Sequence, residues 1–109
     1  MNKNRRKAIR DEILNLKVAL TRDDEEKIQN ELLEIYSNVE FIYDQEEYYM
    51  ENMPENMQGG SKYEKAEEAC DNLREAMEYI YDASYSVSDE INLITNVNKA
   101  IEYLLNATV

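Results

Sequence analysis

Apolar residues in the second quarter of the chain recur at helical spacing. The recurring positions, three or four residues apart, are Ile28, Leu32, Ile35, Val39 and Ile42, followed by Glu46, Tyr49 and Met53. An average repeat of 3.5 residues is the heptad pattern of helices that pack along one side against a partner helix. Glu46 is the only charged residue in this row. The pattern therefore predicts a long amphipathic helix whose inner row is interrupted once.

The segment before this row is also helical, but its connection to the row has two interpretations. Its apolar residues recur at Ile9, Ile13, Leu16 and Leu20. Thr21 and Asp24 can cap a new helix, and the acidic residues that follow suit a helix N-terminus, which indicates a break near 21–24. A second row keeps one spacing through the same stretch, at Leu14, Val18, Thr21, Glu25, Ile28 and Leu32. We favour one continuous helix over about residues 3–52.

Residues 52–64 contain the only proline and both glycines of the chain. Pro54 fits the first turn of a short helix, because that turn does not need its N–H group. The two adjacent glycines provide the positive-φ conformations that end such a turn. Ser61 followed by Glu64 is a capping box, so we expect a second long helix to begin at residue 62 and the chain to reverse direction.

The second half of the chain repeats the three- and four-residue steps without a change of phase. The positions are Tyr63, Ala66, Cys70, Leu73, Met77, Ile80, Ser84, Val87, Ile91, Ile94, Asn98, Ile101 and Leu105. This row predicts a single helix over 62–107, with Ser84 and Asn98 as polar positions within it. The stretch 84–88 has low helix propensity, and Ser86 within it can cap a new helix. A break there would produce a bundle of three or four helices instead of a hairpin.

The expected fold is all-α, with one domain over residues 1–109 built as a long antiparallel hairpin of helices about 3–52 and 62–107. Two helices bury little surface, and this hairpin leaves an apolar edge exposed. The edge consists of Leu14, Val18, Leu33, Tyr81, Leu93 and Leu104. Burial of one Leu or Ile side chain contributes roughly 1.5–3 kcal/mol, so the edge favours a homodimer in which two hairpins form a four-helix bundle.

Charge adds to this picture, because it is large and unevenly distributed. The 109 residues have a formal net charge of −12, yet residues 1–10 contain five basic and no acidic residues. Residues 28–61 contain eight acidic residues and no Lys or Arg. An acidic surface of this kind repels nucleic acid and membranes and attracts basic protein surfaces. The simpler explanation is a solvated helix face that keeps a thin rod in solution.

The acidic segment also contains several tyrosines, which supply rigid contact area in protein interfaces. We therefore expect a partner-binding face over residues 31–55, with a basic surface of another protein as its partner. The candidate residues are Glu34, Tyr36, Glu40, Tyr43, Asp44, Glu46, Glu47, Tyr48, Tyr49, Glu51 and Glu55. Tyrosines at such positions also pack at the edge of a helical core with the hydroxyl group outward, which is the structural alternative.

No residue pattern in the chain indicates an enzyme. Histidine is absent, so the usual general base and the commonest metal ligand are missing. There is no glycine-rich phosphate loop and no Cys pair with zinc-ligand spacing, so no cofactor or metal is expected. The single cysteine, Cys70, is typical of a small core residue in an intracellular protein. No apolar run suits a transmembrane helix or a secretory signal, so we expect a cytoplasmic protein.

A specific motif spans the connector. Residues 52–59 read Asn-Met-Pro-Glu-Asn-Met-Gln-Gly, and segments rich in Glu and Ala follow at 63–69 and 71–76. These stretches, together with Arg5-Arg6-Lys7, resemble small acidic coiled-coil proteins of phages and prophages, which have an N-x-P-E-N-x-Q-G turn and usually a basic start. The stretch 84–88 and the many tyrosines depart from that pattern. The resemblance implies a mobile element in a bacterial host, but the family has no settled activity and assigns no functional residue.

Three functions are compatible with these features. The first, which we favour, is a phage-derived, non-enzymatic inhibitor of the anti-CRISPR or other anti-defence type, which binds a host or defence protein through an acidic face that mimics nucleic acid. The second is a coiled-coil adaptor of phage morphogenesis or DNA metabolism, in which the apolar seam is the functional surface. The third is direct nucleic-acid binding, which the acidic body of the protein weakens, through the basic residues Lys3, Arg5, Arg6, Lys7 and Arg10.

Overall fold

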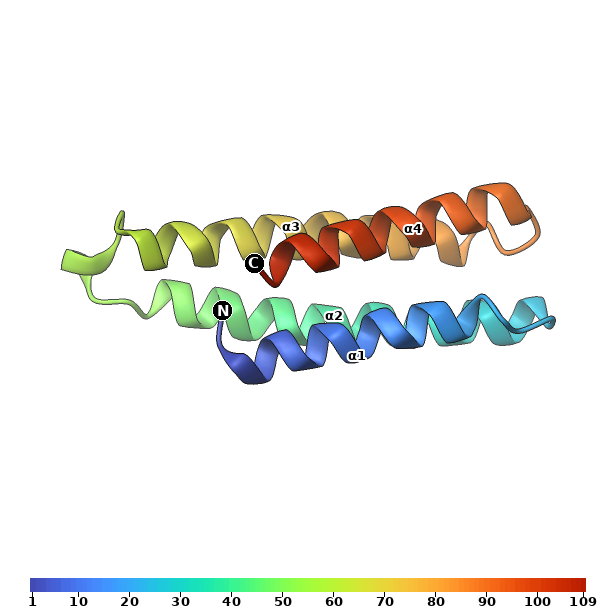
Figure 1. The fold of residues 1–109 in the computed structure, drawn as a ribbon, viewed down its shortest axis with the longest axis horizontal. Helices are drawn as coiled ribbons and strands as arrows, with labels where there is room; N and C mark the ends of the chain where they lie inside the picture. Colours follow the sequence, from blue (N-terminus) through green and yellow to red (C-terminus); the bar gives the residue numbers. More distant parts are fainter.

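The computed structural model describes residues 1–109 and consists of helices, without strands. In chain order the elements are α1 (Lys3–Ala19), α2 (Glu25–Glu51), the 3-10 helix η1 (Glu55–Met57), α3 (Ser61–Ser84) and α4 (Glu90–Ala107). They form a rod of 51 × 20 × 17 Å, in which α1 packs on α2, α2 on α3 and α3 on α4 (Figure 1). The prediction of an all-α fold is confirmed.

The chain breaks between α1 and α2, so the continuous helix that we favoured over residues 3–52 is wrong. α1 ends at Ala19, and Asp24 caps α2 because its carboxylate accepts hydrogen bonds from two N–H groups of the first turn. Thr21 takes no part in this cap, since its hydroxyl donates to the carbonyl oxygen of Val18. The reversal buries the inner apolar row of α1 against the other helices, whereas a straight helix would leave that row in solvent.

A second break separates α3 from α4, so the single helix predicted over 62–107 is wrong and the alternative with a break near 84–88 is correct. Asp89 caps α4 by accepting a hydrogen bond from an N–H group of the first turn at 3.2 Å. Ser86 does not serve as the cap, because its hydroxyl donates to a carbonyl oxygen of α3 at 2.8 Å. A single chain therefore supplies four α-helices, the number that we had expected from two chains; the homodimer itself stays a prediction.

The connector reverses the chain between α2 and α3, with one difference from the predicted start of α3 (Figure 1). Gly59 has a φ of 85°, a left-handed conformation that glycine adopts without strain. Gly60 is the N-cap of α3, and its carbonyl oxygen accepts the first intrahelical bond from the Glu64 N–H at 3.0 Å. The N–H that Ser61 would need is thus already paired, and the predicted capping box of Ser61 and Glu64 does not form.

The core is one cluster of 17 buried residues to which all four α-helices contribute. In α2 the predicted inner row is buried from Ile28 to Glu46, but its next position, Tyr49, is 39% exposed; Met53, which follows the helix, is buried again. In α3 the predicted row is also confirmed at Leu73, Ile80 and the polar residue Ser84, whose hydroxyl donates to the Tyr81 carbonyl oxygen at 2.6 Å. The three- and four-residue spacing therefore predicts the inner face of both central helices.

In α4 the buried row is not the predicted one. The buried residues are Leu93, Val97, Ala100, Leu104 and Ala107. Leu93 and Leu104, expected at an exposed edge, lie in the core, while Asn98, expected inside, is exposed. The five residues between α3 and α4 are not helical, so nothing requires the inner row of α4 to continue the phase of α3. The other four residues of the expected edge are exposed as predicted: Leu14, Val18, Leu33 and Tyr81.

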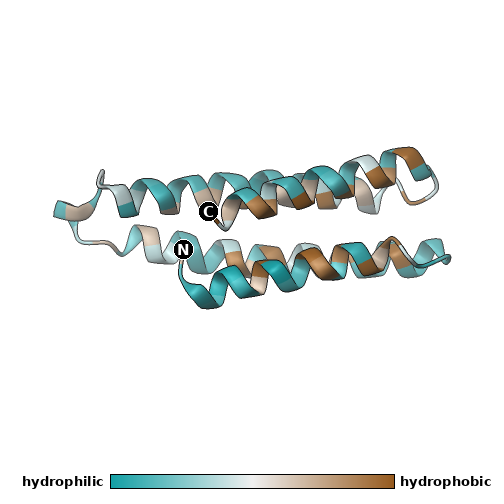
Figure 2. Cartoon of the chain, in the orientation of Figure 1, coloured by the Kyte–Doolittle hydropathy of each residue, from teal (hydrophilic) through white to brown (hydrophobic).

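The predicted row of α4 instead forms a second apolar row on the outside. Of its residues, Ile91 is 79% exposed, Ile94 39% and Leu105 50%, and Ile101 is half-buried. In Figure 2 hydrophobic segments alternate with hydrophilic ones along α4, which carries both rows. The apolar residues of α4 therefore extend over a wider arc of the helix than the other helices of the same chain bury.

The central helices are longer than the outer ones, which shapes one end of the rod. α2 and α3 extend past the start of α1 and the end of α4, so the connector end consists of two helices only (Figure 1). None of the helices has a stretch that is both long and apolar enough to cross a membrane.

Candidate functional site

Four acidic residues of α2 lie in one row on the solvent side of the helix. They are Glu40, Asp44, Glu47 and Glu51, which we call the α2 acidic row. Their spacing of four, three and four residues places them on one face, because an α-helix has 3.6 residues per turn. Three of them are exposed and Glu47 is half-buried. The structure thus brings together four of the predicted site residues, opposite the buried row of α2.

A matching row lies on α3, which packs against α2. It consists of Asp71, Glu75, Glu78 and Asp82, which we call the α3 acidic row, and all four residues are exposed. The spacing is again four, three and four. Our prediction missed this row, although the spacing is visible in the sequence. Its place beside the α2 acidic row follows only from the hairpin of α2 and α3.

Tyrosines line the groove between the two acidic rows. The ring centroids of Tyr36 on α2 and Tyr81 on α3 are 5.9 Å apart, and Tyr85 follows at 5.0 Å from Tyr81. A recess of about 400 Å³ opens here, lined by Tyr36, Arg74, Met77, Glu78, Tyr81 and Asp82. The hydrogen bond with Tyr85 raises the pKa of Tyr81. We call the two acidic rows and this groove the acidic face.

A chain of hydrogen bonds crosses the groove at Tyr43. The Tyr43 hydroxyl donates to Glu47 Oε2 at 2.6 Å and accepts from Arg74 Nη2 at 3.1 Å, while Arg74 Nη1 lies 3.2 Å from Asp71. The bond from Arg74 lowers the pKa of Tyr43, but the bond to Glu47 and burial outweigh it and the pKa is raised. Arg74 is the only cation of α3 after Lys65. Tyr43 therefore joins α2 to α3 through Arg74, and Glu47 fixes the Tyr43 hydroxyl; both residues also contribute to the acidic face.

Glu46, a predicted partner-binding residue, is fully buried and so does not belong to the acidic face. Its Oε2 accepts a hydrogen bond from Arg5 Nε at 2.7 Å, and the Met1 ammonium group lies 3.7 Å from its Oε1. Oε1 has no hydrogen-bond partner. A buried carboxylate needs a cation close by. The residue that interrupts the inner row of α2 therefore attaches the start of α1 to α2.

The remaining candidates lie apart from one another. Glu34 lines a recess between α1 and α2, and Glu55 is on η1. Tyr48 and Tyr49 are exposed and line a cavity at the connector end of the rod. The eleven predicted residues therefore do not form one surface. Six of them belong to the acidic face: Tyr36, Glu40, Tyr43, Asp44, Glu47 and Glu51.

The charges of the folded chain are separated between helices. α1 carries six Lys and Arg residues and two acidic ones, whereas α2 has nine acidic residues and one Lys. Several α1 cations are already paired within the chain: Arg5 with Glu46, and Lys7 with Asp11 at 3.1 Å. Arg6 donates to the Met1 carbonyl oxygen. The basic start predicted as a third binding surface is thus partly used in holding α1 in place.

The single thiol of the protein is buried in the folded chain. Cys70 is buried and unpaired, and burial, with the nearby carboxylates of Glu46 and Glu47, raises the pKa of its thiol to about 12. A thiol must lose its proton to act as a nucleophile, so Cys70 is unreactive near neutral pH. Nowhere do three or more Cys, Asp or Glu side chains gather in a way that could hold a metal ion.

Comparisons with protein-family models, with curated proteins and with solved structures find no match to this chain. No residue role is therefore transferred from a relative. What distinguishes the molecule chemically is its separation of charge, with two acidic rows on α2 and α3 and half of the Lys and Arg residues on α1. Such a surface favours basic partners on one side of the rod.

Proposed function

We propose that this protein is a non-enzymatic inhibitor that binds the basic surface of a nucleic-acid-binding protein through the acidic face. The observation that carries the proposal is the pair of acidic rows on neighbouring helices, with tyrosines in the groove between them. Carboxylates supply charge complementarity and tyrosines supply rigid contact area, which are the two properties that specific interfaces use.

The spacing of the charges supports competition with nucleic acid. Four carboxylates of the α2 acidic row extend over about 16 Å of helix, or about one charge per 5.5 Å. One strand of duplex DNA carries about one phosphate per 3.4 Å along its axis. Two antiparallel helices packed about 8–10 Å apart thus present two lines of negative charge of the same order of density. A groove that binds phosphates with Lys and Arg would accept such a surface.

The resemblance of the connector to phage and prophage proteins suggests which proteins are targeted. A phage gains from blocking the defence proteins of its host, and many of these, CRISPR nucleases among them, act on nucleic acid through basic grooves. We therefore propose an anti-CRISPR or other anti-defence role in the cytoplasm of a bacterial host. Binding by the acidic face requires no cofactor and no chemical step.

The test reverses charge on the α2 acidic row without touching its hydrogen bonds. The variant combines Glu40→Lys, Asp44→Lys and Glu51→Lys, three exposed residues for which no side-chain hydrogen bond or ion pair occurs. The matched control makes the same change of net charge elsewhere, by Asp23→Lys, Glu68→Lys and Glu90→Lys, at three exposed residues whose side chains also form no hydrogen bond or ion pair. Both are expressed in bacteria that carry an active defence system, and phage plaques are counted.

We expect the α2 variant to lose protection of the phage and the control to keep it. Circular dichroism should give the same helix content for both variants, because all six positions are exposed. Equal protection by the two variants would show that the acidic face is not the binding surface.

A second function is favoured by a different surface, the outer apolar row of α4. Ile91, Ile94 and Leu105 are exposed there, and burial of each side chain is worth roughly 1.5–3 kcal/mol. We propose that this row mediates a homodimer, the arrangement that a coiled-coil adaptor of phage assembly would use. The salt dependence of binding distinguishes the two proposed functions. Binding by the acidic face weakens at high ionic strength, while binding by the apolar row does not.

A further inference from the structure

A cavity opens at the connector end of the rod, where α2 and α3 extend past the start of α1. It has a volume of about 680 Å³ and is lined by Arg5, Asp44, Gln45, Tyr48, Tyr49, Asn52, Met53, Pro54, Met57 and Lys62. A smaller recess of about 350 Å³ adjoins it, with Arg5, Tyr49 and Lys62 as shared walls and Lys65 at its other side. We call the two together the notch. Pockets that bind small ligands are commonly of about 300–1,000 Å³.

Arg5 is held in the notch in a geometry that leaves part of its guanidinium free. Its Nε donates to the buried Glu46 at 2.7 Å, and its Cζ lies 5.3 Å from the centroid of the Tyr49 ring. The two terminal nitrogens of Arg5 donate to no group of this chain. A guanidinium that is fixed at Nε presents its remaining N–H groups in a planar fork that suits a phosphate or a carboxylate.

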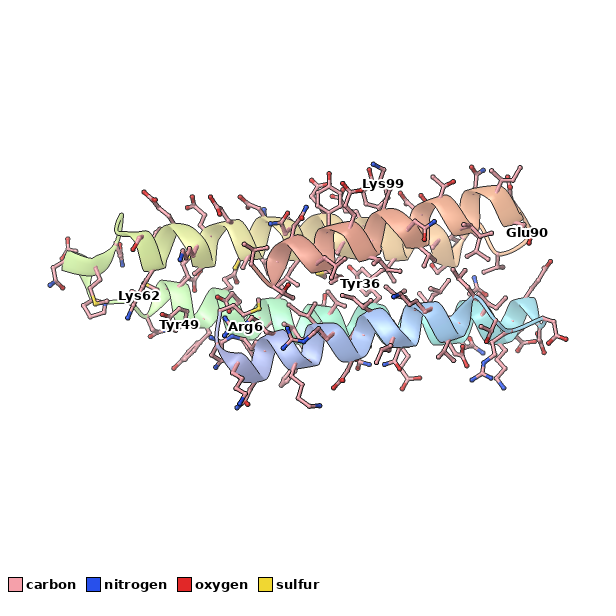
Figure 3. All side chains as sticks on the ribbon, viewed as in Figure 1. Arg6, Tyr36, Tyr49, Lys62, Glu90 and Lys99 are labelled. Carbon is pink, nitrogen blue, oxygen red and sulfur yellow. The ribbon has the colours of Figure 1, made fainter.

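Two lysines add charge at the same place. Lys62 and Lys65, in the first turns of α3, form no ion pair, although acidic residues outnumber basic ones two to one in this chain. Figure 3 shows Lys62 and Tyr49 close together at the connector end of the rod, beside the start of α1. Asp44 is the only exposed acidic residue that lines the notch. The notch is thus locally cationic in an acidic protein.

The other walls are flat or apolar. Tyr48 is 71% exposed and Tyr49 39%, and Met53, Pro54 and Met57 form the end wall. Aromatic rings bind flat ring systems by stacking, and methionine side chains adapt to irregular shapes. We propose that the notch binds a small ligand that joins a flat ring system to a phosphate or carboxylate group, and that a nucleoside monophosphate is the simplest member of this class.

The acidic surface around the notch limits the ligand to a small one. A longer nucleic-acid strand would have to place further phosphates near Asp44, which lines the notch, and on a protein of net charge −12. A single nucleotide stays within the notch, and charges further away are screened over about 8 Å at physiological ionic strength. The notch shares Asp44 with the acidic face, but the groups proposed to bind the ligand, namely Arg5, Tyr49 and the two lysines, lie outside that face.

The experiment is a titration of the ¹⁵N-labelled protein, followed by the amide signals of Arg5, Tyr49 and Met57. The probes are AMP, adenosine, inorganic phosphate and indole-3-acetate, each up to about 10 mM, which covers dissociation constants in the millimolar range. We expect saturable shifts with AMP, and affinities for adenosine and for phosphate that are at least about tenfold weaker. Indole-3-acetate distinguishes the two sources: tighter binding than AMP would identify an aromatic carboxylate as the ligand.

Variants connect the shifts to the notch. Lys62→Gln combined with Lys65→Gln should weaken AMP binding about tenfold, because two charged donors to the anionic group are lost. The control, Lys17→Gln with Lys27→Gln, removes the same charge from two exposed lysines that also form no ion pair and do not line the notch, so it should leave the affinity unchanged. Three results would each overturn the proposal: equal weakening by the two double variants, no saturable shift with AMP or with indole-3-acetate, or an affinity for inorganic phosphate equal to that for AMP, which would mean an adventitious ion only.

Discussion

Helices α2 and α4 are both amphipathic, but they divide their apolar residues differently. In α2 the aliphatic residues at the predicted spacing form a single buried row, and the opposite side is acidic. In α4 the aliphatic residues form two rows, of which one is buried and the other exposed. The sequence of α2 therefore indicates which side of the helix faces the core, whereas the sequence of α4 contains two equally regular apolar rows, either of which could face it.

The difference indicates what determines the rotation of each helix about its own axis in this bundle. The acidic row of α2 makes any rotation costly, because its carboxylates would have to leave water. In α4 few charges oppose a rotation, since Lys99 and Glu102 are its only charged residues after Glu90. The orientation of α4 is instead decided by its packing against α3. The rings of Tyr79 on α3 and Tyr103 on α4 stack with their centroids 5.8 Å apart, and the small buried residues Ala100 and Ala107 allow α4 to approach the core closely.

The largest effect is expected where the buried row of α2 contains a charge. Arg5→Met removes the hydrogen-bonded cation of the buried Glu46 and leaves only the Met1 ammonium group at 3.7 Å, so it should lower the free energy of unfolding by about 3–5 kcal/mol. Urea denaturation followed by circular dichroism measures this change. The control adds Glu46→Met to the same chain. Since a buried ion pair is often replaceable by apolar residues, the double variant should regain most of the loss; if it does not, the pair contributes more than mutual neutralisation.

Two neighbouring leucines distinguish the rows of α4. Leu104 is fully buried and Leu105 is 50% exposed. Leu104→Ala should cost about 2–5 kcal/mol through lost burial and the cavity that remains, whereas Leu105→Ala should cost below about 1 kcal/mol. The same urea denaturation compares them. Equal costs, or a larger cost at Leu105, would mean that α4 is rotated toward the row that the sequence pattern predicted.

How much of the fold the sequence predicts differs along the chain for a physical reason. Within one unbroken helix the phase of the inner row is fixed by 3.6 residues per turn, so Ile28 correctly implies Val39 and Ile42. Across a break the phase is free, so Ile80 does not imply Ile91. Where a helix breaks depends on whether an N-cap is more favourable than continuing the helix. An N-cap contributes only about 1 kcal/mol, so the local residues alone do not determine the result.

The candidate site was predictable to a similar extent. Exposure of Glu40, Asp44 and Glu51 follows from their place opposite the inner row of α2. The burial of Glu46 follows from the same spacing. The cation that offsets the cost of burying its charge, Arg5, comes from α1, and this pairing could be identified only from the folded structure. The spacing of the α3 acidic row is visible in the sequence, but its place beside the α2 acidic row, like the notch, arises from contacts between segments far apart in the sequence. Such contacts have no signal in the spacing of a single helix.

The break that separates the phases of α3 and α4 is itself testable. Asp89→Ala removes the cap of α4 and should lower stability by about 1 kcal/mol, as for other N-caps. Ser86→Ala is the control, because its hydroxyl caps no N–H group of α4: it donates to the Asp82 carbonyl oxygen and accepts only a long bond, of 3.5 Å, from Asn96, so its loss should cost less than that of the Asp89 cap. Thermal melting at neutral pH compares the two variants with the parent. An equal loss from Ser86→Ala would indicate that the serine, which the sequence also offered as a cap, is the residue that sets the break.

The smallest effect on stability belongs to the outer row of α4, where the expected change is in association. Ile91→Gln and Leu105→Gln replace exposed side chains in a helix that tolerates glutamine, so each should alter the free energy of unfolding by about 0.5 kcal/mol or less. If the outer row forms a homodimer, the double variant should be monomeric in light scattering at concentrations where the parent is dimeric. Leu33→Gln, also exposed but on α2, should leave the dimer intact. A parent that is monomeric throughout would mean that the second row of α4 has no partner of its own kind, and that α4, unlike α2, keeps apolar residues in solvent.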